Sequence, residues 1–303
     1  MTTAATAPTA TVPIAQACVT ALAAENPHAR DARVAFEEVE HVYTIDGDPG
    51  LAYTSVTTFL KKTYFEEFDA DAVIERMMAS PKWSQSQYHG MTAAQIKDQW
   101  HANGVQSADQ GTRLHAAIEA YYNGVSIDPD DPHLHDIQPE FHRMFRAFHD
   151  EYVVPRGYTP YRTEWCVFDE SLRLAGSIDM VYRRRQPDAG AGSDADADAD
   201  ADDDDEELLI YDWKRTKKLS KTNPFACCRG VLSGLPDSNY WHYALQLNMY
   251  RWILQKNYGK RVARLALVVL HPSNDSYQVV PLPLLDDLVE KIVEARLEDA
   301  RTR

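Results

Sequence analysis

Two charged residues interrupt a segment that is otherwise apolar. Residues 208–218 read LLIYDWKRTKK, and the apolar run from Leu208 to Trp213 predicts a buried β-strand. Asp212 and Lys214 stand two residues apart, so in a strand their side chains emerge on the same face. Because an unpaired charge inside a protein is costly, the segment predicts either a structural ion pair or a site that needs a carboxylate and an ammonium group together.

A second carboxylate, Asp179, is expected to lie beside this pair. It stands near the middle of another predicted strand, residues 172–184, and a hairpin would bring it close to Asp212. Adjacent carboxylates suit Mg²⁺, and the carbonyl of Trp213 is a further predicted oxygen ligand. Lys214 is then predicted to orient a water and to stabilise charge that develops on phosphorus. An ion pair of Lys214 with either aspartate is the structural alternative.

Apolar periodicity and capping residues predict the elements that position these groups. Helices are expected over residues 55–62, 69–80, 92–104, 107–124, 138–153 and 238–259, and from Leu284 onward. Strands are expected over residues 34–45, 161–169, 172–184, 208–216 and 261–272, and near Tyr277. Gly104 is expected to stop one helix, Ser107 to cap the next and Gly124 to close it. The core order is therefore helix, three strands, helix, strand.

The chain of 303 residues is expected to divide into three parts. They are a flexible N-terminal tail over residues 1–33, a strand and helical segment over residues 34–105 that packs on the core, and the core itself over residues 106–303. No apolar run is long enough to span a bilayer, and the first 29 residues contain no Lys or Arg. We therefore expect a soluble, intracellular protein without a signal or transit peptide.

One segment dominates the net charge of −15. Residues 193–207 carry ten acidic residues and no base, and removing these ten leaves −5, so the charge does not exclude a nucleic-acid partner. The residues that match ligand positions of a calcium-binding EF-hand loop are Asp196, Asp198, Asp200 and Glu207. Ala201 stands where that loop needs glycine, and no helices flank it. Residues 188–207 are therefore predicted to be a solvated, disordered insertion.

Four motifs together resemble the PD-(D/E)xK nuclease superfamily. GSID at residues 176–179 and DWK at residues 212–214 are similar to its paired acidic motifs. GTRLH at residues 111–115 and the Q-x-x-x-Y pattern at residues 246–250 are similar to its RecB-type and lambda-exonuclease-like branch. The resemblance covers roughly residues 111–272, about half of the chain. It implies an α/β (α+β) fold with a restriction-endonuclease-like core, a central mixed β-sheet flanked by helices in the order αβββαβ.

The resemblance also implies roles for individual residues. The expected catalytic residues are His115, Asp179, Asp212 and Lys214. The expected ligands of Mg²⁺ or Mn²⁺ are His115, Asp179, Asp212 and the carbonyl of Trp213. Gln246 and Tyr250, which share a helix face, would contact DNA or order the catalytic residues. Glu119, one turn after His115, and Glu164, on the strand where relatives often place an acid, would support the site. Without the resemblance, a lone helical histidine is more often packed or solvated.

Basic residues flank the predicted site on both sides. They occur at Arg183–Arg185 and in KRTKKLSK at residues 214–221, where Arg215 and Lys217 are expected to contact phosphates. Solvated loop charge is the alternative for both clusters. The aromatic residues of the helix over residues 238–259 are expected to stack on unpaired bases or, at helical spacing, to belong to the core.

The cysteines do not point to a metal cluster. Cys18, Cys166, Cys227 and Cys228 show no zinc-ligand spacing, so free thiols in a reducing compartment are expected. Superfamily members that carry an iron–sulfur cluster place one cysteine before the core and three near the C-terminus. No cysteine follows Cys228, so no iron–sulfur cluster is expected.

These observations predict a metal-dependent DNA nuclease, an exonuclease or flap-processing enzyme of DNA replication, recombination or repair, similar to viral proteins from large DNA viruses. Its expected partners are DNA ends or single-stranded regions, with no membrane partner, and a homo-oligomer is compatible with the sequence. Two alternatives stay open. One is a catalytically inactive DNA-binding or scaffold protein of the same fold, and the other is an RNA-directed nuclease with the same site.

Overall fold

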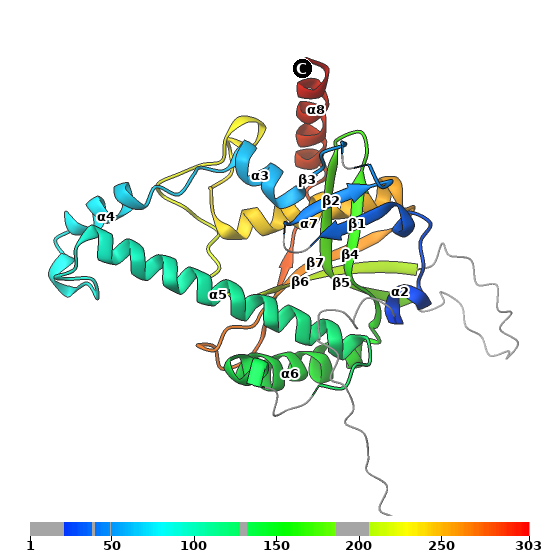
Figure 1. Cartoon of the computed structure of the whole chain (residues 1–303), viewed down its shortest axis with the longest axis horizontal. Coiled ribbons are helices and arrows are strands. Elements are labelled where there is room, and N and C mark those ends of the chain that lie inside the picture. The colour runs from blue at the N-terminus through cyan, green and yellow to red at the C-terminus, as the bar shows by residue number, and fades with distance from the viewer. Residues whose placement is uncertain (1–20, 38–39, 49, 128–131, 186–205, 303) are drawn as a thin grey trace, which may run out of the picture.

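A mixed β-sheet with helices on both faces forms the centre of the protein (Figure 1). The computed structural model describes residues 21–37, 40–48, 50–127, 132–185 and 206–302. Within these residues the sheet has six strands: β3 (Thr54–Ser55), β4 (Thr159–Asp169), β5 (Leu174–Arg185), β6 (Glu206–Lys214), β7 (Val262–Val269) and β8 (Gln278–Leu282). Strands β1 (Val34–Glu37) and β2 (Val42–Ile45) form a separate antiparallel pair, where the sequence predicted one strand.

Strand order explains why one long helix must connect two neighbouring strands. β4, β5 and β6 pair in antiparallel fashion, but β6 and β7 are parallel. A parallel pair needs a crossover, and α7 (Asn239–Asn257) supplies it. The order α5 (Ala93–Tyr122), β4, β5, β6, α7, β7 agrees with the predicted helix, three strands, helix, strand. The predicted mixed α/β class is therefore confirmed.

The sheet is buried on both faces, which accounts for the continuous apolar run in β6. Leu208 and Ile210 pack on the side of α3 (Val56–Tyr64), α7 and α8 (Asp286–Thr302). Leu209 and Tyr211 pack on the opposite side, against α5 and the helical residues 139–156. The helix α4 (Ala70–Met78) and the first part of α5 extend away from the sheet (Figure 1). We call α4 and the first part of α5 the helical arm.

Helix starts follow the predicted caps. Ser55 and Asp69 accept hydrogen bonds from the amides three residues on, and Thr92 forms a full capping box with Gln95. Gly124, with φ of +72°, follows the end of α5 in the left-handed conformation that glycine adopts most easily. The sequence therefore located these ends correctly.

The predicted break inside α5 is wrong. One helix runs from Ala93 to Tyr122, so Gly104 and Ser107 are interior residues rather than a stop and a cap. Glycine in a helix costs only about 1 kcal/mol, and the capping box at one end and buried side chains such as Leu114 at the other outweigh it. The predicted boundary between residues 105 and 106 falls inside this helix and is also wrong.

The last part of the predicted flexible tail is ordered. Residues 21–33 include α2 (Ala21–Glu25) and a 3₁₀ turn (Asp31–Arg33) that pack on β4. Asp31 accepts hydrogen bonds from Arg162 at 2.7 Å and from Trp165 at 2.9 Å. The prediction over residues 1–33 is therefore wrong for residues 21–33, because a buried ion pair was not visible in an Ala-rich segment. Residues 1–20 lie outside the described residues.

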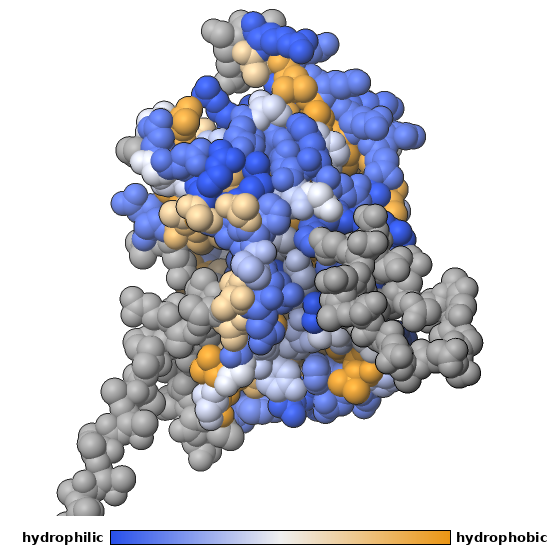
Figure 2. Space-filling view, turned by 90° about the vertical axis from the view of Figure 1, so that its right-hand side faces the viewer, coloured by the Kyte–Doolittle hydropathy of each residue, from blue (hydrophilic) through white to orange (hydrophobic). Residues whose placement is uncertain are grey.

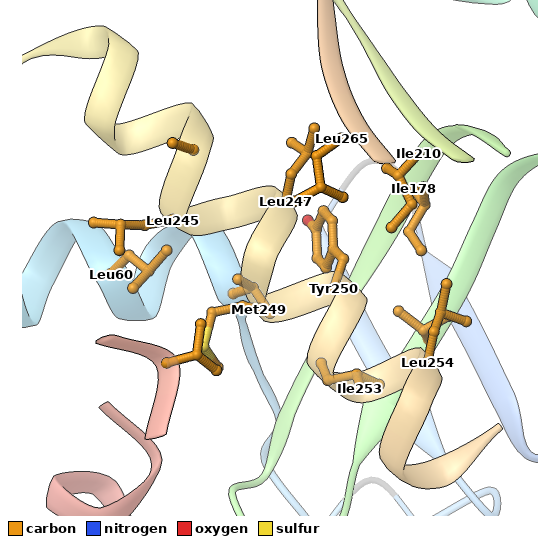
Figure 3. Packing of buried hydrophobic residues seen from close by; sticks show 14 of the residues in the cluster. Leu60, Ile178, Ile210, Leu245, Leu247, Met249, Tyr250, Ile253, Leu254 and Leu265 are labelled. Carbon is orange, nitrogen blue, oxygen red and sulfur yellow. The ribbon is translucent and has the colours of Figure 1, made fainter. Parts of the chain in front are cut away.

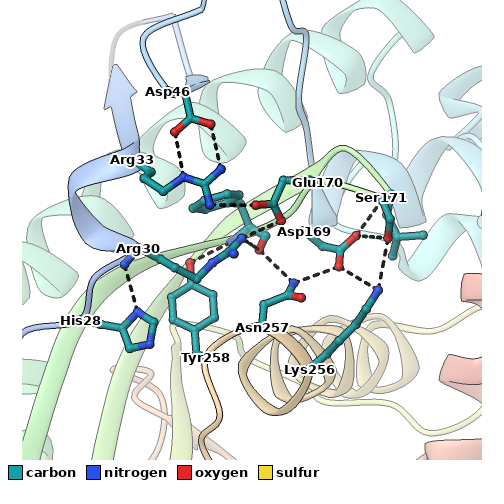
Figure 4. Close-up of polar contacts among 12 residues, drawn as sticks. His28, Arg30, Arg33, Asp46, Asp169, Glu170, Ser171, Lys256, Asn257 and Tyr258 are labelled. Atoms are coloured by element: carbon teal, nitrogen blue, oxygen red, sulfur yellow. Dashed lines mark hydrogen bonds and ion pairs between the residues drawn. The ribbon is translucent and has the colours of Figure 1, made fainter.

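Charged residues also fasten this N-terminal segment to the β4–β5 turn (Figure 4). Arg30 forms a 2.7 Å ion pair with Glu170, and its guanidinium lies 4.0 Å from the centre of the Phe168 ring. Arg33 joins Glu170 at 3.0 Å and Asp46 at 2.7 Å. The β1–β2 pair is thereby tied to the sheet rather than attached only through the chain.

Two residues of the predicted acidic insertion belong to the sheet. Glu206 and Glu207 are the first residues of β6, and Glu207 is buried, with ion pairs to Arg184 at 2.7 Å and to Arg261. Their assignment to a disordered loop is therefore wrong, because arginines on the neighbouring chain segments neutralise them. The rest of that insertion, with the EF-hand-like aspartates, lies outside the described residues.

The predicted helix over residues 138–153 is present but irregular. A π-helix (Pro139–Phe145), α6 (Arg146–Phe148), a second π-helix (His149–Val153) and a 3₁₀ turn (Val154–Arg156) follow one another, and a 3₁₀ segment (Pro132–Ile137) precedes them. Another 3₁₀ turn (Trp83–Gln85) joins α4 to α5, and one (Gly230–Leu232) precedes α7. On the face shown in Figure 2, hydrophilic residues predominate and hydrophobic ones occur in small separate groups.

Candidate metal centre

The GSID motif occupies a gap along one edge of β5. β4 pairs with the other edge of β5 over almost its whole length. On the edge with the gap, β3 pairs only with Leu174 and Ala175, and β6 pairs only from Met180 onward. Among the described residues, no strand therefore covers this edge over residues 176–179. The backbone there is open to side chains from other elements.

Tyr250 of α7 packs over the first residue of this stretch, Gly176. Figure 3 shows its ring pointing from α7 towards the sheet, beside Ile178 and Ile210. A Cβ atom at Gly176 would lie 2.5 Å from Cε1 of Tyr250 and 2.7 Å from its hydroxyl oxygen, so only glycine permits this approach. Gln246 donates to the Tyr250 hydroxyl at 3.4 Å. Tyr250 is 4% exposed, so of its two predicted roles the structure supports ordering of the site rather than contact with DNA.

Asp179 fills the last part of the gap. Pairing between β5 and β6 stops at Met180 and Tyr211, and the strands separate beyond that point. The amide of Trp213 donates instead to Oδ2 of Asp179 at 3.0 Å. The carboxylate thus takes the place of a strand partner, which holds it at the fork between β5 and β6.

His115 of α5 reaches the same fork. Its Nε2 lies 3.1 Å from the carbonyl oxygen of Trp213, and its Nδ1 lies 3.6 Å from Oδ2 of Asp179 and 3.8 Å from Oε1 of Glu164. When Nε2 carries the proton and donates to the carbonyl, Nδ1 turns a lone pair towards the two carboxylates. Metal-binding histidines show this arrangement, with the far nitrogen held by a carbonyl or carboxylate.

Glu164 of β4 completes the cluster. One ligand atom from each of His115, Glu164 and Asp179 lies within 4.8 Å of the others. Glu164 has a φ of +43°, which is uncommon for a residue with a side chain, and its Oε2 accepts a 2.7 Å hydrogen bond from the Ser177 hydroxyl. Strained backbone of this kind persists where the surrounding structure holds it, and it is found most often at functional sites.

Asp212 and Lys214 form an ion pair next to the cluster. Oδ2 of Asp212 lies 2.6 Å from Nζ of Lys214, and the Asp212 side chain is only 3% exposed. Nζ also lies 4.8 Å from the centre of the Tyr243 ring on α7, a cation–π contact that holds the lysine on this side of β6. The ion pair of Lys214 with an aspartate, which the sequence offered as the alternative to a functional site, is thus present for Asp212. Further carboxylates that Lys214 does not neutralise lie beside it.

The pKa values show that the site holds more negative charge than it neutralises. Burial raises the pKa of Asp212 to about 6, and repulsion from Asp179 adds to this effect. Burial also raises the pKa of Asp179, and attraction to His115 and Lys214 offsets it only in part. Burial acts to lower the pKa of His115, but Asp179 and Glu164 outweigh it and raise that pKa to about 9. Each of these shifts favours bound positive charge.

The donor set fits a hard divalent cation. Mg²⁺ takes oxygen ligands at about 2.1 Å in octahedral geometry, so two protein ligands of one ion lie about 3 to 4 Å apart. The 3.6 Å and 3.8 Å separations around Nδ1 of His115 fall in that range and exceed a hydrogen bond. A nitrogen beside two carboxylates also suits Mn²⁺. His115, Glu164 and Asp179 are therefore the residues that would hold the ion.

This triad differs from the predicted ligand set in two places. Asp212 was predicted as a ligand, yet its carboxylate is engaged by Lys214 and its atoms are not among the three that meet. The Trp213 carbonyl, also predicted as a ligand, lies instead against Nε2 of His115. Glu164, predicted only as a supporting residue, takes a central position. The only signal in the sequence was its place on the strand where relatives often carry an acid.

Several other predicted residues lie outside the cluster. Glu119 is half-buried on α5, and its carboxylate is not among the ligand atoms that meet. Arg215 is paired at 2.8 Å with Glu140, which is fully buried, so its expected contact with phosphate is replaced by a structural ion pair. Lys217 is exposed beyond the end of β6.

The cluster Arg183–Arg185 does not flank the metal centre. These residues pair with Leu208, Glu207 and Glu206, at the end of the β5–β6 hairpin away from the fork. Arg183 and Arg184 form ion pairs with Glu206 at 3.6 Å and Glu207 at 2.7 Å. The cluster therefore lies away from Asp179, because strand direction carries it to the other end of the hairpin, and its contact with phosphates stays a prediction.

No protein-family model matches the chain, and no curated protein matches it either. Among the described helices, none combines the length and the apolar composition needed to cross a membrane. Cys166, Cys227 and Cys228 carry free thiols. The functional argument therefore rests on the geometry at the fork.

Proposed function

We propose that this protein is a Mg²⁺- or Mn²⁺-dependent nuclease of the PD-(D/E)xK type that hydrolyses phosphodiester bonds in DNA. The observation that carries the proposal is Nδ1 of His115, 3.6 Å from Asp179 and 3.8 Å from Glu164, beside the ion pair of Asp212 and Lys214. A histidine and two carboxylates provide the ligands, and a lysine provides a fixed positive charge on the open side. Metal-dependent phosphodiester hydrolysis uses both, the metal to activate water and the positive charge to stabilise the transition state.

Each residue of the site has a separate task in this proposal. His115, Glu164 and Asp179 hold the cation, which when bound supplies Lewis acidity and a water of lowered pKa. Lys214, whose pKa the carboxylates of Asp212 and Asp179 raise against the effect of burial, stays charged and stabilises negative charge on the phosphate. Asp212 holds Lys214 in place through the 2.6 Å ion pair. Tyr250, packed against Gly176 and held by Gln246, orders the β5 backbone next to Asp179.

A digestion experiment tests the proposal. End-labelled linear single-stranded and double-stranded DNA, a closed circle and single-stranded RNA are incubated with the protein in Mg²⁺, in Mn²⁺ and in EDTA. The wild type is compared with Asp212→Asn and with Asp150→Asn, an exposed aspartate on the helical run 139–156. We expect loss of linear DNA that both EDTA and Asp212→Asn abolish and that Asp150→Asn leaves unchanged.

The remaining outcomes contradict specific parts of the proposal. Intact DNA in every lane with a mobility shift on a native gel would make the protein a DNA-binding or scaffold protein. Cleavage of RNA in preference to DNA would change the substrate. Cleavage that survives EDTA would exclude the metal. Nicking of the closed circle would keep the nuclease assignment but establish an endonuclease.

A further inference from the structure

The connection between β6 and α7 carries an unusual charge distribution. It begins at Arg215, directly after Lys214, and its acidic residue, Asp237, comes only at its end. Its basic residues are Arg215, Lys217, Lys218, Lys221 and Arg229. Lys217, Lys218 and Lys221 are exposed. A run of exposed positive charge therefore leads away from the metal centre on one continuous piece of chain.

This connection is held in a defined conformation by hydrogen bonds to the start of α7. Asn239 accepts from the amide of Ser220 at 2.9 Å and donates to the carbonyl of Lys218 at 2.8 Å. Trp241 donates from Nε1 to the carbonyl of Lys221 at 3.1 Å. The backbone of each exposed lysine region is thus anchored to a helix that also carries Tyr250. The positive charges are placed before any ligand arrives.

Two exposed aromatic rings lie on this connection and on the segment between α3 and α4. Phe225, on this connection, is 78% exposed, and Phe68, between α3 and α4, is 68% exposed. They are the two most exposed large hydrophobic side chains among the described residues. The Arg76 guanidinium of α4 lies 5.1 Å from the centre of the Phe225 ring, so the connection contacts the helical arm at this point. Exposed aromatic faces of this kind are available for unpaired bases to stack on.

The aromatic residues lie at a distance from the metal centre. Phe68 packs against Trp100 of α5 with ring centres 6.0 Å apart. Trp100 and His115 lie fifteen residues apart on the same helix, which corresponds to about 22 Å along its axis. Glu66 and Glu67, next to Phe68, are exposed and would repel phosphates. We therefore expect the phosphates of a bound strand to lie along the lysines. Its bases are expected to lie near the aromatic rings.

We infer that residues 217–225 and Phe68 form a guide for single-stranded DNA that leads to the metal centre. Phosphates contact Lys217, Lys218 and Lys221, and unpaired bases stack on Phe225 and Phe68. A single strand is the occupant because its bases are free to stack, whereas duplex bases are not. The inference rests on the proposed function and adds the form of the substrate and the path it takes.

Binding measured without catalysis tests the guide. A fluorescent single-stranded DNA of about 12 nucleotides, within the range of single-strand site sizes, is titrated in EDTA at several salt concentrations. We expect Phe225→Ala to weaken binding about tenfold. Replacement of Lys217, Lys218 and Lys221 by alanine should reduce the slope of log K against log salt by about 2, because each phosphate contact contributes about 0.7.

Matched controls come from the 3₁₀ turn Val154–Arg156, which ends the helical run 139–156. Val154→Ala removes another exposed apolar side chain, 57% exposed, and Arg156→Ala removes another exposed charge. Both variants should bind single-stranded DNA as the wild type does. Thermal unfolding of every variant shows whether the fold is kept, which is expected because the substituted side chains are exposed.

The outcomes separate this inference from the proposed function. A wild type that cleaves and binds DNA, together with Phe225 and lysine variants that bind equally well, overturns the guide and leaves the nuclease. A wild type that prefers blunt duplex to single strand also overturns the guide. A wild type that neither binds nor cleaves DNA overturns both. A tenfold loss in Phe225→Ala with an unchanged control supports the guide.

Discussion

Asp169 and Asp179 are both aspartates of the β4–β5 hairpin with little exposure, yet their surroundings are opposite. Asp169 is 1% exposed and receives hydrogen bonds from Ser171 at 2.6 Å, the Leu172 amide at 2.7 Å and Asn257 at 2.9 Å. Lys256 lies at 3.1 Å (Figure 4). Burial acts to raise the pKa of Asp169, but these donors outweigh it and lower the pKa below its ordinary value.

The carboxylate of Asp179 has far less support. The Trp213 amide donates to it at 3.0 Å, and its charged neighbours are His115, Lys214 and the carboxylate of Glu164. Burial raises its pKa, and the neighbours do not reverse the shift. The comparison teaches that burial of an acid does not by itself indicate function. The number of donors does, because a fully satisfied carboxylate has no capacity left for a ligand.

The largest expected effect is a loss of nuclease activity without a loss of stability. Asp179→Asn removes a proposed ligand, and we expect nuclease activity to fall by about 10³-fold. Because the raised pKa indicates that the charged form is unfavourable in the folded state, the variant should unfold at the same or a higher temperature than the wild type. Activity assays and thermal unfolding check the two halves. A variant that loses stability and activity together would contradict the comparison.

The second substitution should show the reverse pattern. Asp169→Asn keeps the shape of the side chain but leaves donors such as the Leu172 amide facing an amide group, and it removes the pair with Lys256. We expect a loss of about 3 kcal/mol in the free energy of unfolding, with activity per folded molecule unchanged. Urea denaturation measures the loss. Stability equal to that of the wild type would show that the donors around Asp169 make no net contribution to the free energy of unfolding.

Low pH should remove the stabilisation that the Asp169 carboxylate provides. The folded-state pKa of Asp169 lies below its unfolded value near 3.8, so its stabilisation is fully present above that value and is lost as pH falls through the folded-state pKa. The difference in unfolding free energy between wild type and Asp169→Asn should therefore be constant from pH 5 to 7 and shrink below about pH 4. Urea denaturation at pH 7 and pH 3 checks this. An equal difference at both values would refute the lowered pKa.

The smallest effects concern two glycines. Gly176→Ala places a Cβ against the Tyr250 ring, and we expect a loss of about 2 kcal/mol in stability with reduced activity, because the gap beside Asp179 is disturbed. Gly104→Ala, in the middle of α5 with no atom within 4 Å of the new Cβ, should instead stabilise by about 0.5–1 kcal/mol. Thermal unfolding compares them. Destabilisation by Gly104→Ala would revive the predicted helix stop.

Local patterns in the sequence determined the secondary structure and much of the site. Ser55 and Asp69 cap helices as predicted, and apolar runs located β4, β5, β6 and β7. That His115 reaches Asp179 was expected only from the resemblance of the motifs, whereas the helix that carries His115 and the strands that carry Asp179 and Lys214 follow from apolar periodicity and capping. These are short-range properties, and they need no knowledge of the rest of the chain.

Contacts between distant segments were decided only by the tertiary structure. Glu164 takes the place of Asp212 in the candidate triad, because the backbone at Glu164 is left-handed and the carboxylate of Asp212 is paired with Lys214. Arg215 donates a hydrogen bond to Glu140, which is 75 residues away in the sequence. Contacts between residues so far apart in the sequence depend on strand register and helix packing, and these in turn depend on one another. No local pattern contains that information.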